Sequence, residues 1–122
     1  IPTFIQHAAI QALDQGDDFI RTMVSRCAES RAIFIEGLSG LPRLRMRAPD
    51  GAFYLFFSVE GETDSRALAR RILYDAKVGL APGTAFGPEG LGCLRLCFAI
   101  SPELAREAVA RLRAFFLGAK PA

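Results

Sequence analysis

The spacing of apolar residues changes at residue 41, and this change limits the folds that the chain can adopt. Before it, apolar residues recur every three or four positions, which predicts a helix over residues 1–15 and a longer one over about 17–40. After it, residues 43–47 alternate with period two and residues 52–59 are rich in aromatic and β-branched side chains. A Pro-Asp-Gly turn separates the two segments, so we expect a β-hairpin that follows a long helical stretch.

The second half of the chain mixes both kinds of element. The remaining signals are a capped helix, a short strand, a loop rich in glycine and proline, another strand and a final helix; they cover residues 65–76, 77–80, 81–92, 93–100 and 101 onward. This order predicts an α+β fold, in which a small, mainly antiparallel sheet has helices packed on one face and follows a long N-terminal helical arm. We expect residues 1–40 to form the arm and residues 41–122 to form the small α+β domain.

Composition excludes several classes of protein. No apolar run approaches the ~20 residues that a membrane span needs, and a net charge of +2 is too small to indicate a nucleic-acid partner. The three cysteines are an odd number without metal-ligand spacing, which favours a reduced, cytoplasmic protein with no metal site. Cys93 and Cys97 would stand ~13 Å apart along a strand, too far to share one ion. The sequence assigns these two thiols no role.

Arg95 is the one charged residue within the predicted strand 93–100. The apolar residues of that strand alternate, so one face is expected to meet the core; it carries Leu94, Leu96, Phe98 and Ile100. Arg95 lies on the other face, among two thiols and an alanine methyl. A partly buried guanidinium without an anion is costly. The residues alone leave two interpretations, a structural ion pair with an acid such as Glu89 or Glu36, or a site for an anionic ligand.

The residues taken alone contain no complete catalytic set. His7, the single histidine, lies beside an apolar helical stripe with no nucleophile or carboxylate at a supporting spacing, so we expect a structural or surface role. The glycines between residues 83 and 92 lack the spacing of nucleotide-binding loops.

Three stretches together carry a resemblance to a known family: Pro49–Tyr54, Val78–Gly87 and Gly90–Ala99. In this order and spacing they resemble the C-terminal part of class I/II aminotransferases, the fold-type I enzymes that use pyridoxal phosphate. The segment Pro2–Ala9 resembles the residues that lead into that family's interdomain helix. The resemblance implies that Arg95 binds the substrate's α-carboxylate and that the arm joins two domains.

The resemblance also implies what the full-length enzyme does. It would be a transaminase of amino acid metabolism, moving an amino group from an amino acid to a 2-oxo acid, and its partners would be these substrates, the large cofactor domain of the same chain and a second subunit in a homodimer. In the family, the lysine, aspartate and phosphate-binding loop that hold pyridoxal phosphate precede the position of Ile1. We therefore expect no catalytic, cofactor-binding or metal-binding residue in this chain, and we expect the fragment alone to be inactive.

Some positions depart from the family's pattern, and two alternatives stay open. Cys93, Cys97 and Leu91 stand where the family often has an aromatic residue, a small polar residue and an acid. One alternative is a free-standing module of regulatory type that binds an amino acid. The other is a different fold-type I enzyme, such as a lyase or a decarboxylase, because the arginine is widely shared among them.

Overall fold

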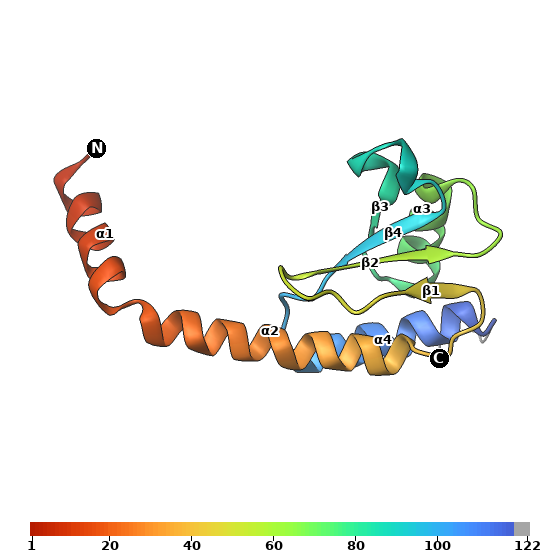
Figure 1. The fold of residues 1–122 in the computed structure, drawn as a ribbon, viewed down its shortest axis with the longest axis horizontal. Helices are drawn as coiled ribbons and strands as arrows, with labels where there is room; N and C mark the ends of the chain where they lie inside the picture. Colours follow the sequence, from red (N-terminus) through yellow and green to blue (C-terminus); the bar gives the residue numbers. More distant parts are fainter. Residues whose placement is uncertain (119–122) are drawn as a thin grey trace.

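Two helices form an arm at the N-terminus of the computed structural model, which describes residues 1–118 (Figure 1). Helix α1 (Thr3–Gln15) buries none of its residues, and α2 (Asp17–Leu38) follows it after Gly16. A side chain at Gly16 would lie 2.2 Å from the backbone oxygen of Ala12, so only glycine fits where one helix turns into the next. In Figure 1, α1 and the first turns of α2 extend away from the rest of the molecule.

The strands form one antiparallel sheet in the order β1-β2-β4-β3. They are β1 (Leu44–Met46), β2 (Tyr54–Val59), β3 (Ala81–Pro82) and β4 (Cys93–Cys97). The predicted hairpin is confirmed as the pair of β1 and β2. Strand β4 lies between β2 and β3, and its residues Leu94 and Arg95 are paired with a neighbouring strand on both sides.

Helices cover one face of this sheet, as the sequence predicts for an α+β fold. They are α3 (Ser65–Ala76), α4 (Pro102–Phe116) and the last turns of α2, which run beside α4 (Figure 1). Helix α3 begins at Asp64, whose carboxylate accepts hydrogen bonds from the backbone N–H groups of Arg66 and Ala67. Helix α4 begins at Ser101, whose hydroxyl accepts from the N–H of Leu104. The hydrophobic core lies between these helices and the sheet.

Helix α2 takes part in both the arm and the core. Its last turns bury Ser30, Phe34 and Leu38, and the Ser30 hydroxyl donates to the carbonyl of Ile100 over 2.9 Å. Its first turns expose large apolar side chains, among them Phe19, Ile20 and Met23. The predicted boundary at residue 40, between an arm of residues 1–40 and a domain of residues 41–122, therefore stays a prediction. The last four residues of that predicted domain lie outside the described part of the chain.

The largest differences from the sequence-based prediction concern two strands. The short strand predicted at 77–80 is wrong, because pairing with β4 begins only at Ala81. Lys77 adopts a left-handed conformation with φ of 57° as α3 ends, and the chain reaches the sheet edge after it. Strand β4 ends at Cys97 instead of residue 100, because β2 begins at Tyr54 opposite it; beyond that point the Phe98 N–H donates to the carbonyl of Phe53 and the chain turns toward α4.

None of the helices within residues 1–118 combines the length and the apolar character that crossing a membrane requires.

Candidate functional site

Arg95 lies at the middle of β4 on the face of the sheet that no helix covers. Its neighbours Leu94 and Leu96 are buried in the core, and Arg95 itself is half-buried. Its Cα is paired with Phe56 of β2 on one side and with Ala81 of β3 on the other. The alternation of β4 therefore places the guanidinium on the open face, as the sequence predicts.

The guanidinium lies over two aromatic rings. Its Cζ atom lies 4.1 Å from the ring centroid of Tyr54 and 3.9 Å from the ring centroid of Phe86. We call these two rings the aromatic clamp. Each contact is a cation–π interaction, worth about 0.5–1 kcal/mol at an exposed site and more where water is excluded. Aromatic rings carry no net negative charge, so they do not neutralise the positive charge of Arg95.

No acid neutralises Arg95 within the part of the chain that the structure describes. The ion pairs among residues 1–118 do not include it, and the interpretation that it pairs with Glu89 or Glu36 is not supported. Its N–H groups form no hydrogen bond with these residues either. A half-buried guanidinium whose N–H groups have no partner among the described residues can bind a planar anion through its N–H edge.

The loop that carries Phe86 is closely packed against itself and against α3. It contains two short 3₁₀ turns, η1 (Gly83–Phe86) and η2 (Pro88–Gly90). A side chain at Gly90 would lie 2.1 Å from the backbone oxygen of Gly83, so the two turns meet where only glycine fits. The buried Ser65 hydroxyl donates to the Gly90 carbonyl over 2.8 Å. These contacts fix the loop and therefore the position of Phe86.

Replacing Ser65 with alanine is expected to lower the free energy of unfolding by about 1–3 kcal/mol, because the Gly90 carbonyl would lose its buried donor. Urea denaturation of the chain measures this difference. Ser39→Ala is the matched control, since the Ser39 hydroxyl also donates to a carbonyl but is exposed. Equal losses for the two variants would contradict the role given to the buried hydrogen bond.

The clamp residues are functional candidates that the sequence-based reasoning did not find. Tyr54 alternates with the core residues Leu55 and Phe57, so its ring is on the open face. Phe86 is a large ring in a loop of small residues. Both signals are present in the sequence, but only the fold shows that the rings meet at Arg95.

The other residues singled out from the sequence lie elsewhere. His7 is exposed on α1, and Cys27 lies on α2 at the edge of the core. Cys93 and Cys97 lie at opposite ends of β4, opposite Ser58 and Tyr54 respectively. Within residues 1–118 no group of three or more His, Cys, Asp or Glu side chains comes together in a way that could hold a metal ion.

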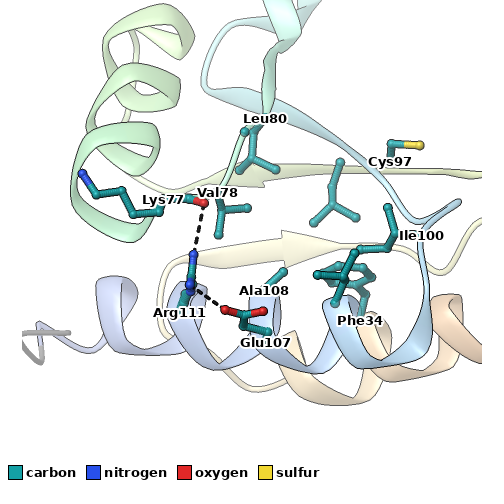
Figure 2. Close-up of a pocket in the computed structure, with 12 residues that line it drawn as sticks. Phe34, Lys77, Val78, Leu80, Cys97, Ile100, Glu107, Ala108 and Arg111 are labelled. Carbon is teal, nitrogen blue, oxygen red and sulfur yellow. Dashed lines mark hydrogen bonds and ion pairs between the residues drawn. The ribbon is translucent and has the colours of Figure 1, made fainter. Parts of the chain in front are cut away.

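A separate cavity of about 330 Å³ lies between α4, the end of α3 and the sheet (Figure 2). Its lining is mostly apolar, with Phe34, Leu80 and Ile100 among its residues, and Figure 2 shows the ion pair of Glu107 and Arg111, which also line it. Neither Arg95 nor the clamp rings line it. This cavity is therefore not part of the site around Arg95.

The described residues do not form a site for an aldehyde cofactor that bonds to a lysine. Lys77 is the one lysine among residues 1–118, and it follows the last turn of α3, where its ammonium donates to the carbonyl of Tyr74 over 2.7 Å. That position is not among the residues of the open face around Arg95. Lys120 lies outside the described residues.

Comparison with known proteins identifies the family. The family model for aminotransferase class I and II matches residues 1–112. The chain belongs to this family, whose members depend on pyridoxal phosphate, and the resemblance seen in the sequence is confirmed.

Individual relatives agree with this assignment. The chain is 32% identical to an aspartate aminotransferase of Pyrococcus horikoshii over 98% of this chain and 32% of that protein. Its fold is similar to that of an alanine aminotransferase from Pyrococcus furiosus, with a TM-score of 0.83, 28% identity, and coverage of 93% of this chain and 29% of that one. It is also similar to an aromatic aminotransferase from Pyrococcus horikoshii, with a TM-score of 0.85, 30% identity, and coverage of 95% and 32%. The chain thus spans about a third of the length of these proteins.

Proposed function

We propose that this chain is the small C-terminal domain of a pyridoxal-phosphate-dependent aminotransferase, and that Arg95 binds the α-carboxylate of the amino-acid substrate. The observation that carries the proposal is the guanidinium on the open sheet face, in contact with two aromatic rings and without an acid partner among residues 1–118. The family assignment supports the reaction class, transfer of an amino group to a 2-oxo acid.

The chemistry of the guanidinium suits this role. Its planar fork can donate two parallel, charge-assisted hydrogen bonds to a carboxylate, which fixes the orientation of the substrate as well as binding it. Orientation matters because the bond to be broken at Cα must be aligned with the cofactor's ring. Pyridoxal phosphate, when bound by the rest of the enzyme, supplies the electron sink for that step. The contribution of this chain is to bind and orient.

The arm is proposed to connect this domain to the large cofactor domain of the same chain. Its large apolar side chains are exposed on both helices: Phe4, Ile5, Ile10, Leu13, Phe19, Ile20, Met23 and Val24. Apolar surface of this extent is typical of a surface that a neighbouring domain covers. A homodimeric, cytoplasmic enzyme remains a prediction from the family resemblance.

An activity assay of the full-length enzyme tests the proposed function. We expect it to transaminate at least one of L-aspartate, L-alanine and L-phenylalanine with 2-oxoglutarate, the donors being chosen from the names of the similar proteins. Release of CO₂ or of ammonia from these amino acids without amino transfer would instead indicate a decarboxylase or a lyase.

The isolated chain of residues 1–122 is expected to transaminate none of these amino acids and to leave the absorbance spectrum of added pyridoxal phosphate unchanged. The physical reason is that the described residues place no lysine on the open face. Absorption spectroscopy and calorimetry with the same amino acids measure both properties. Tight binding of an amino acid by the isolated chain would favour a free-standing binding module and contradict the proposal.

A further inference from the structure

We propose that Tyr54 and Phe86 are positioning residues, which hold the plane of the Arg95 guanidinium in place before the substrate arrives. This inference rests on the proposed function, since it concerns how the same arginine meets a carboxylate. Its basis is the pair of distances from Cζ to the two ring centroids, 4.1 Å to Tyr54 and 3.9 Å to Phe86. At these distances the guanidinium is in contact with both rings, and these contacts restrict the orientations that its plane can take.

The two rings come from parts of the chain that are fixed independently. Tyr54 lies on β2, which is hydrogen-bonded to β1 and β4, and its backbone is paired with Cys97. Phe86 ends η1, whose position depends on the contact of Gly83 with Gly90 and on the hydrogen bond from Ser65. The Phe86 ring also meets the Phe56 ring edge-on, with centroids 6.4 Å apart. The clamp is therefore part of the folded domain and does not need a ligand to form.

A fixed guanidinium plane helps binding because arginine is otherwise a flexible side chain. A free arginine loses much of its rotamer freedom when it binds, and this loss weakens binding. In this domain the loss occurs on folding, so the carboxylate meets two N–H groups that already point in one direction. Two parallel hydrogen bonds to a carboxylate require approach along the N–H edge of the guanidinium, and in this proposal the ring contacts hold that edge in one direction.

The competing explanation is that the rings only pack on the sheet and contribute to stability. The two explanations differ in how the ring substitutions combine with a change at Arg95. A lysine ammonium has no plane to align, so the rings can act as positioning residues only when residue 95 is arginine. A packing role would be the same with either residue.

The test is a double-mutant cycle in the full-length enzyme, with the best donor among L-aspartate, L-alanine and L-phenylalanine as the probe. With Arg95 present, we expect Tyr54→Leu and Phe86→Leu each to raise KM about tenfold while kcat changes less than about threefold. Tyr54→Phe keeps the ring and is expected to keep KM within about twofold. In the Arg95→Lys background, the same leucine substitutions are expected to change KM by less than about twofold.

Phe115→Leu is the matched control. Phe115 also has an arginine over its ring, with Arg71 Cζ 5.9 Å from the centroid, but it lies on α4, away from Arg95. We expect this variant to keep the KM of the unsubstituted enzyme.

The other outcomes contradict either the clamp proposal or the proposed function. If Arg95→Lys is costly but the leucine variants leave KM unchanged, or if they cost as much in the lysine background, the clamp proposal is wrong and the proposed function stands. The clamp is also wrong if Tyr54→Phe loses as much as Tyr54→Leu. If Arg95→Lys alone leaves the kinetics unchanged, the proposed function fails, and the clamp proposal fails with it.

Discussion

Replacing Arg95 with lysine in the full-length enzyme is expected to lower kcat/KM for its amino-acid substrates. The expected loss of transition-state stabilisation is about 2–5 kcal/mol, the range typical of removing one partner of a buried charge pair. Lysine keeps the positive charge, so the loss measures the planar fork and its two parallel hydrogen bonds. The half-buried position of Arg95, covered by Tyr54 and Phe86, reduces the water that could replace a lost hydrogen bond. Steady-state kinetics with the panel of amino donors measures the effect.

Arg71→Lys is the matched control for this substitution. Arg71 pairs with Glu62 over 3.3 Å and its own side chain is 54% exposed, so the exchange to lysine keeps the charge and alters only an ion pair away from Arg95. Such pairs contribute at most about 1 kcal/mol to stability and none of that is expected to appear in kcat/KM. If Arg95→Lys behaves like Arg71→Lys with every amino acid tested, Arg95 does not bind the substrate's carboxylate.

The sequence predicts the elements of this fold well where the signal is local. Helix α3 has the predicted bounds, because Asp64 supplies the cap and apolar residues recur on one face. The open face of β4 could also be predicted, because alternation alone places Arg95 opposite Leu94 and Leu96. Both features depend on residues that are close together in the sequence, so they can be predicted from the sequence alone.

The parts that the sequence did not predict depend on contacts between distant segments. The position of β3 depends on which residue reaches the edge of β4, and that residue is Ala81, after the left-handed turn at Lys77. The aromatic clamp depends on the register of β2 against β4 and on the packing of Gly83 against Gly90. Periodicity and spacing describe neither the register nor the packing.

The substrate's side chain cannot be read from this domain either. The similar proteins are named for aspartate, alanine and aromatic amino acids, yet they share this fold. A site that binds the α-carboxylate recognises the part that all amino acids have in common. If Arg95 binds the α-carboxylate as proposed, the residues that distinguish one amino acid from another must include residues beyond the proposed site around Arg95.

Phe34→Ala is expected to lower the free energy of unfolding of the chain by about 3–5 kcal/mol, because truncation of a buried phenylalanine leaves a cavity. Phe34 is 1% exposed, on the part of α2 that packs beside α4. It also lines the cavity of about 330 Å³ in Figure 2, which leaves little material nearby to fill the new space. Urea denaturation of the chain of residues 1–122 measures the loss.

Phe19→Ala is the control on the same helix. Phe19 is 73% exposed in the chain, so its truncation removes little buried surface, and we expect the free energy of unfolding to change by less than about 0.5 kcal/mol. In the full-length enzyme the same substitution is expected to cost more, because the proposed cofactor domain would cover this part of the arm. A small effect of Phe34→Ala would contradict the assignment of the last turns of α2 to the core, and an equal effect of Phe19→Ala in the chain and in the full-length enzyme would contradict the covered arm. Since the two residues share one helix, the pair of variants separates the part of α2 that stabilises this domain from the part available to join it to another.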